Sequence, residues 1–262
     1  MTDEVRNALL VFVGGVLVLI VADGSYLHYV RPGSAPLVLG AGLVILALAG
    51  VDVVRDLRGR PAVDAASAPP AAGAAGGHEG HGEHGAGRMA WLMLVPVLTI
   101  LLVAPPALGA DAVGLAGDRA APVAATPADE PLPPGDAPTL AVVDFVSRVA
   151  AAPAGPGAPP DPLAARDVTL TGFLVPARAG SGTDLARLVI SCCAADASPV
   201  RVHLTDPSGA LGDAGPTGTG DHWVTVRGRL VAGTGTAADS YVPTLRLVHA
   251  SAVPPAVPAY EY

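Results

Sequence analysis

Three histidines lie close together in the first half of the sequence, in the segment HEGHGEH. His78, His81 and His84 follow at three-residue spacing, with Glu79 and Glu83 between them. Neutral imidazoles combined with carboxylates suit Zn²⁺, Ni²⁺ or Cu²⁺, and a glycine-rich chain can wrap such ligands around one ion. The alternative is a solvated polar tether, because a floppy site lacks the outer partners that hold metal ligands and so binds weakly. A low-affinity metal collector or sensor is one hypothesis for this segment.

A second group of reactive side chains lies in RLVISCCAADASPV, nearer the C-terminus. Cys192 and Cys193 are adjacent, Asp196 follows three residues later, and His203 lies on the next predicted strand. Thiolate, carboxylate and imidazole donors could form a metal site or an activated thiol. Adjacent strand residues point to opposite faces, so both thiols serve one ligand only if a bulge or turn intervenes. The alternatives are a strained vicinal disulfide, or a buried cysteine beside an aspartate that caps a turn.

Composition and motifs exclude several other classes of function. The formal charge of −8 argues against a nucleic-acid partner, since backbone phosphates demand a basic face. Two adjacent cysteines cannot provide a disulfide framework. The sequence contains no Ser/His/Asp constellation, phosphate-binding loop or HExxH motif. We therefore predict that the protein is not an enzyme.

The elements that would position these groups begin with three apolar runs, which predict a transmembrane region over residues 1–110. The expected spans are residues 8–30, 36–54 and 89–109, and residues 55–88 form the histidine-containing loop between the last two. The uncharged part of the first run is shorter than the roughly 20 residues a span needs, so we extend it to residue 30. A cleaved signal peptide is the alternative, although its start would be more basic.

Arginines near the ends of these spans predict the orientation in the membrane. Five lie on the side of the N-terminus and the histidine loop, and two on the other side (Arg6, Arg55, Arg58, Arg60 and Arg88 against Arg31 and Arg119). We therefore expect a multi-pass protein of the cell membrane, with its N-terminus cytoplasmic and its C-terminal domain extracytoplasmic. Asp23, His28 and Asp52 stand at the membrane boundary, where polar groups either pair with another helix or lie at the interface.

The C-terminal half predicts a small all-β domain. Residues 111–137 read as a flexible Pro/Ala-rich linker, and residues 138–262 as the domain, which starts with a short amphipathic helix over 139–151. Five strand-like segments follow, at residues 167–176, 185–192, 199–205, 222–231 and 244–249. With glycines at Gly172 and Gly228 where strands could bend, we expect a five-stranded OB-like barrel, with a small open sandwich as the alternative.

The order of spans, histidine-rich loop and β domain is combined with a motif of Arg187, Ile190, Cys192, Cys193 and Asp196, a WVTVRG strand and a Pro/Tyr-rich ending. In these features the chain resembles the YcgQ-like family of permease accessory subunits. The resemblance implies a two-component membrane system with a multi-span permease and a link to zinc or another divalent metal. The histidine loop here is shorter than the densest versions in the family and lacks cysteine.

The leading hypothesis is a non-enzymatic accessory subunit that docks on a permease within the lipid bilayer. Its histidine loop would sample metal, and its β domain would bind substrate or partner through Arg187, Cys192, Cys193 and Asp196. The second hypothesis is a membrane-tethered thiol or metal-relay protein that uses the adjacent cysteines, although they lack the usual C-x-x-C redox spacing. The third is a purely structural membrane assembly protein.

Overall fold

A computed structural model describes residues 3–58, 107–116, 131–152, 161–177, 182–212, 221–237 and 241–262. The chain divides into two compact units, which are treated separately. The first comprises Met1–Tyr26 and Gly33–Pro106, and the second comprises Leu27–Pro32 and Ala107–Tyr262. The predicted histidine site at residues 78–84 and nearly all of the third predicted span lie outside the described residues.

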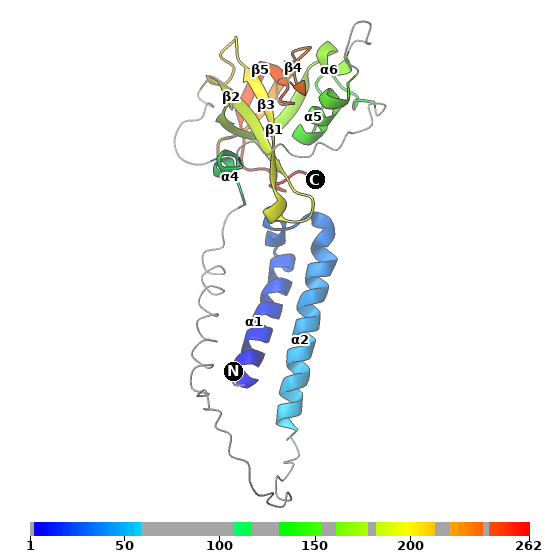
Figure 1. Cartoon of the computed structure of the whole chain (residues 1–262), viewed down its shortest axis with the longest axis vertical. Helices are drawn as coiled ribbons and strands as arrows, with labels where there is room; N and C mark the ends of the chain where they lie inside the picture. The colour runs from blue at the N-terminus through cyan, green and yellow to red at the C-terminus, as the bar shows by residue number, and fades with distance from the viewer. Residues whose placement is uncertain are drawn as a thin grey trace, which may run out of the picture. The chain divides into compact units, whose positions relative to one another are not determined.

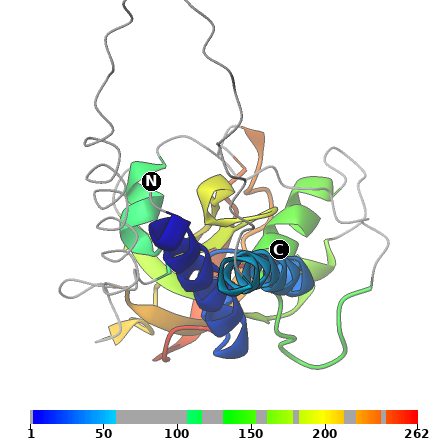
Figure 2. The same cartoon turned by 90° about the horizontal axis from the view of Figure 1, so that it is seen from below.

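The first unit contains two apolar helices, α1 (Asp3–Ala22) and α2 (Ala35–Leu57). They lie side by side in both views of the molecule (Figures 1 and 2). The stretch Pro32–Arg55 is long and apolar enough to cross a membrane, with a mean hydropathy of 2.5, whereas the apolar part of α1, Arg6–Ala22, is shorter. One helix capable of spanning a membrane is thus confirmed among the described residues.

The predicted continuation of the first helix to residue 30 is not observed. The α1 helix ends at Ala22, and the Asp23 carboxylate accepts hydrogen bonds from the backbone N–H and the hydroxyl of Ser25, at 2.8 and 2.6 Å. A short 3₁₀ turn, η1 (Ser25–His28), follows, and a second one, η2 (Pro32–Ser34), precedes α2. Local capping by aspartate competes with helical hydrogen bonding and stops the helix here.

Two glycines let α1 and α2 approach closely. A Cβ atom added at Gly14 would lie 2.8 Å from Cγ of Leu46, and one added at Gly42 would lie 3.1 Å from the Gly14 carbonyl oxygen. Small residues at such crossings permit backbone contact between apolar helices. Asp52, one of the three boundary polar residues, pairs with Arg6 across the two helices at 2.9 Å.

The second unit is built on five strands: β1 (Val168–Pro176), β2 (Thr183–Val189), β3 (Ser198–Thr205), β4 (Trp223–Leu230) and β5 (Thr244–Ala252). They close into a barrel in the order β1-β2-β3-β5-β4. All neighbours are antiparallel except β3 and β5, which are parallel. The prediction of five strands is therefore confirmed, and closure rules out the open sandwich.

Close backbone approach explains the two strand glycines. A Cβ atom at Gly172 would lie 2.6 Å from the Ala186 carbonyl oxygen, and one at Gly228 would lie 2.5 Å from the Arg246 carbonyl oxygen. Gly172 stands where β1 passes from pairing with β4 to pairing with β2, and a register shift occurs between Arg227 and Gly228. Glycine in a strand interior marks such bends.

Three short helices pack on the barrel: α4 (Ala110–Leu115), α5 (Val142–Ala151) and α6 (Pro162–Ala165). The α5 helix corresponds to the predicted amphipathic helix but begins three residues later, and it buries Val142, Phe145 and Val146. Figure 1 shows α5 and α6 close to the strands. The predicted linker over 111–137 is wrong in part, because α4 is helical there and buries Val113 against the core beneath β1 and β2.

Candidate functional site

The two cysteines lie in a turn that follows β2. The predicted strand over 185–192 extends three residues too far at its C-terminal end. The observed strand β2 stops at Val189, and residues 191–193 bend away from it. Cys193 then becomes the N-cap of a 3₁₀ helix, η3 (Ala194–Asp196). The turn that would let adjacent thiols face one ligand is therefore present.

The carboxylate of Asp196 organises this turn. Its Oδ1 accepts the backbone N–H of Ser191 at 2.8 Å, and its Oδ2 accepts the N–H groups of Cys192 at 2.8 Å and Cys193 at 3.4 Å. An aspartate side chain that satisfies several successive N–H groups replaces the strand ladder with a local turn. The backbone around both cysteines is thereby wrapped around one carboxylate.

Three metal-ligating side chains converge in this turn. The Sγ atoms of Cys192 and Cys193 are 3.6 Å apart, and these two atoms and a carboxylate oxygen of Asp196 all lie within 4.8 Å of one another. Cys192 is exposed and Cys193 half-buried, and neither is in a disulfide. Two thiols, one carboxylate and access to solvent would offer a divalent ion three protein ligands and an open position, as in sites that hold Zn²⁺ with three protein ligands.

The spacing of the sulfur atoms favours a tetrahedral ion. With Zn–S bonds of about 2.3 Å, sulfurs 3.6 Å apart subtend about 103° at the metal, close to the tetrahedral angle. An ion that holds two thiolates in line would need sulfurs about 4.6 Å apart with bonds of that length. The turn therefore presents the thiols at a separation that zinc can take with little rearrangement.

The carboxylate and the neighbouring thiol shift each other's proton affinity. A hydrogen bond to Asp196 raises the pKa of the Cys192 thiol to about 11, with smaller contributions from Cys193. The same hydrogen bond, with those from the backbone N–H groups, lowers the pKa of Asp196 to about 2. The aspartate is thus ionised at neutral pH, and Cys192 carries a proton that a metal ion would displace.

The sequence of this region matches a described protein family. A DUF1980 C-terminal domain is found at residues 158–262. The match includes all five strands and the cysteine turn. Neither the curated proteins nor the solved structures contain a significant match to the chain. The match begins after α1, α2, α4 and α5, so the wider YcgQ-like resemblance goes beyond it.

Arg187, predicted as part of the cysteine motif, has a different place in the DUF1980 domain. Its side chain is buried, its Nη2 donates to the Pro258 carbonyl oxygen at 3.2 Å, and its guanidinium lies 4.8 Å from the centre of the Trp223 ring. Its Nε is 3.3 Å from Oε1 of Glu261. These contacts point inward to the core, so Arg187 is not part of the group formed by the two thiols and Asp196.

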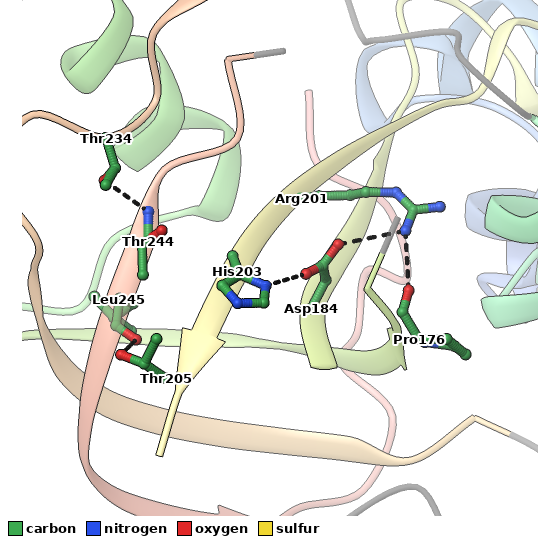
Figure 3. Close-up of polar contacts among 8 residues, drawn as sticks. All are labelled: Pro176, Asp184, Arg201, His203, Thr205, Thr234, Thr244 and Leu245. Atoms are coloured by element: carbon green, nitrogen blue, oxygen red, sulfur yellow. Dashed lines mark hydrogen bonds and ion pairs between the residues drawn. The ribbon is translucent and has the colours of Figure 1, made fainter. Parts of the chain in front are cut away.

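His203 is also separate from the cysteine turn. The register of β2 and β3 pairs it with Asp184, five residues along β3 from Ser198 and so about 17 Å from the turn. Figure 3 shows its Nδ1 directed at Oδ1 of Asp184, 2.9 Å away, while Arg201 approaches the other oxygen at 3.5 Å. The proposed Cys/Asp/His combination is therefore wrong in its histidine.

Two residues at the end of the chain position the site, and the sequence analysis did not single them out. The backbone of Glu261 donates to the Leu188 carbonyl at 2.9 Å and accepts from Ile190 at 3.1 Å, so it extends the sheet beside the end of β2. Tyr260 is almost fully buried. The only signal for them was the Pro/Tyr-rich ending, which belongs to the DUF1980 match.

Proposed function

We propose that the chain is a non-enzymatic, membrane-anchored subunit that binds a divalent metal ion, zinc above others, in the turn formed by Cys192, Cys193 and Asp196. The observation that carries this proposal is the convergence of three donor atoms within 4.8 Å at an accessible end of β2. This proposal combines the metal-relay hypothesis with the accessory-subunit hypothesis. The accessory subunit would itself bind the metal ion that the two-component membrane system handles.

A redox role for the adjacent thiols has weaker support. Thiol–disulfide exchange needs an attacking thiolate, and the raised pKa of Cys192 makes its thiolate rarer at neutral pH than that of an ordinary cysteine. Metal binding tolerates such a thiol, since the ion displaces the proton on coordination. The carboxylate that hinders exchange is itself a metal ligand, which favours metal binding over redox chemistry.

The partner we propose is a multi-span permease in the same membrane. This part rests on the resemblance to the YcgQ-like family and on the exposed apolar side chains along α2, which include Leu37, Leu43, Val44 and Leu48. The topology we propose has the segment between the helices and the DUF1980 domain both extracytoplasmic. Residues 27–32 belong to the same compact unit as that domain. This supports the orientation in the membrane that the arginine count predicts.

We further propose that the barrel is of OB type. The strand order β1-β2-β3-β5-β4 and the parallel pairing of β3 with β5 support this assignment. OB-type barrels bind their ligands mainly through one face and its adjoining loops. The cysteine turn, which connects β2 to β3, is a loop of this kind.

The proposal is tested by purifying the tagged full-length protein from its native membrane, as wild type and as the Cys192→Ser/Cys193→Ser variant. We expect about one zinc per chain in the wild type, its loss in the variant, and the same co-purified permease in both. The triple variant H78A/H81A/H84A is the matched control and should retain this zinc. Equal metal content in the wild type and the cysteine variant would contradict the metal site, and the absence of any permease would contradict the subunit role.

A further inference from the structure

The short connection between the two apolar helices lies on the cysteine turn. Residues 27–32 join α1 to α2 along the chain, yet they belong to the compact unit of the DUF1980 domain. Val30 forms an isolated antiparallel bridge with Cys193. The connection therefore pairs, through a single β-bridge, with the turn that holds the three donor atoms.

Three hydrogen bonds join the segment to the turn. The N–H of Ala194 donates to the Tyr29 carbonyl oxygen at 2.7 Å, and the N–H of Arg31 donates to the Cys192 carbonyl oxygen at 3.3 Å. The Arg31 guanidinium donates through Nη1 to the Ser191 carbonyl oxygen, also at 3.3 Å. The backbone on both sides of the thiols is thus hydrogen-bonded to two residues of the connection, Tyr29 and Arg31.

The other end of the segment is held by the buried Tyr260. Its hydroxyl donates to the His28 carbonyl oxygen at 3.1 Å and accepts the N–H of Leu108 at 2.9 Å. This anchor holds His28 to the domain independently of the cysteine turn. A movement of the turn relative to His28 would therefore change the pairing between residues 29–31 and residues 192–194.

We infer that occupancy of the Cys192/Cys193/Asp196 site is coupled to the pairing of residues 29–31 with the turn, so that the connection between α1 and α2 reports whether the site holds a metal ion. The inference rests on the proposed function. Closing two thiols and a carboxylate on one ion restrains the same backbone that the bridge uses. Coupling between two such events is reciprocal, so the pairing also sets the affinity of the site.

Hydrogen exchange on the full-length protein in detergent tests the first direction. On saturation with zinc we expect the amides of Arg31 and Ala194 to exchange at least about fivefold more slowly, the lower end of typical coupling between sites. The amide of Val231, which donates to the Thr244 carbonyl within the barrel, serves as the control and should not change.

Zinc titration of variants tests the reverse direction. Arg31→Pro removes the donor to Cys192, and we expect the dissociation constant for zinc to rise about fivefold or more. Ser34→Pro, three residues further along, is the matched control and should bind as the wild type does. Tyr260→Phe is the second variant, in case Arg31→Pro does not fold, and should weaken zinc binding in the same direction by removing the anchor of His28.

The outcomes separate the inference from the proposed function. Zinc binding with unchanged exchange at Arg31 and Ala194, and with equal affinity in the variants and the wild type, would overturn the coupling and leave the metal site intact. Failure of the wild-type protein to bind zinc would overturn both. Slower exchange together with weaker binding in Arg31→Pro or Tyr260→Phe supports the coupling.

Discussion

Glu261→Ala is expected to destabilise the DUF1980 domain by about 3–5 kcal/mol, the usual cost of removing one partner from a buried ion pair. The carboxylate accepts the N–H of Val142 at 2.9 Å and that of Val143 at 2.7 Å, at the start of α5, whose own N-cap residue provides no side-chain acceptor. It also faces the buried Arg187 at 3.3 Å. Alanine would leave two helix N–H groups and a guanidinium without this carboxylate.

Burial and pairing act in opposite directions on this pair. Burial raises the pKa of Glu261, while the two N–H groups and Arg187 lower it. Burial also lowers the pKa of Arg187, and Glu261 opposes that change. The charged forms therefore depend on each other, so the loss of one side is costly.

Hydrogen exchange of the β2 and β3 amides in the full-length protein measures the effect of Glu261→Ala. A loss of 3–5 kcal/mol corresponds to roughly 150- to 4,000-fold faster exchange of the most protected amides. Glu261→Gln keeps an acceptor for α5 and should lose less. The double variant Arg187→Met/Glu261→Met removes both charges and should recover part of the loss. Exchange rates in Glu261→Ala within threefold of the wild type would show that the pair does not stabilise the domain.

The second large effect is expected at the Cys192 thiol. With a pKa of about 11, its thiolate fraction rises tenfold for each pH unit up to that value, so alkylation by iodoacetamide should accelerate steadily from pH 7 to pH 10. Asp196→Asn removes the negative acceptor and should bring the pKa back towards 9.0. The thiolate fraction at pH 8 would then rise about 100-fold, but a less basic thiolate is also a weaker nucleophile, so the net acceleration should be about tenfold.

Mass spectrometry of metal-free protein, alkylated for increasing times and then digested, separates this effect from general loosening of loops. Asp206→Asn is the matched control, because Asp206 likewise caps a turn by accepting the N–H groups of Ala210 and Leu211. That variant should leave Cys192 reactivity unchanged. Equal alkylation rates in Asp196→Asn and the wild type at pH 8 would contradict the thiol–carboxylate contact.

The strands were predictable because their signal is local. Alternating apolar residues and the glycines at Gly172 and Gly228 placed all five strands to within a few residues. The same pattern left the closed barrel and the open sandwich as alternatives, and the observed strand pairings decide for the barrel. The helix α4 was missed because a single buried residue, Val113, carries its packing in an alanine-rich stretch. No periodicity can be detected in so short a helix.

The site was predictable only in its residue types. Cys192, Cys193 and Asp196 were identified as candidate donors from their spacing, but their convergence depends on where β2 ends, and element boundaries are poorly encoded in local sequence. Arg187 was assigned to the same site as part of the motif that carries the family resemblance, and His203 because it lies on the next predicted strand. The strand register places His203 at the far end of β3, and the side chain of Arg187 is buried in the core.

The contacts of residues 27–32 could not be foreseen from the sequence. Tyr29 and Arg31 meet residues 192–194 across more than 160 positions, through backbone groups that every residue carries. The length that a membrane span needs led us to extend the first span to residue 30. Only the fold shows that the helix stops at Ala22 and that the following residues pair with the cysteine turn.

The central claim is that the cysteine turn binds the metal, and X-ray absorption at the zinc edge of the metal-loaded, full-length protein tests it most directly. We predict a shell of two sulfur atoms at about 2.3 Å with oxygen or nitrogen at about 2.0 Å, matching Cys192, Cys193, Asp196 and one further ligand. The sulfur shell should disappear in Cys192→Ser/Cys193→Ser. A shell of nitrogen and oxygen alone in the wild-type protein, as the histidines at positions 78, 81 and 84 would provide, would contradict the account.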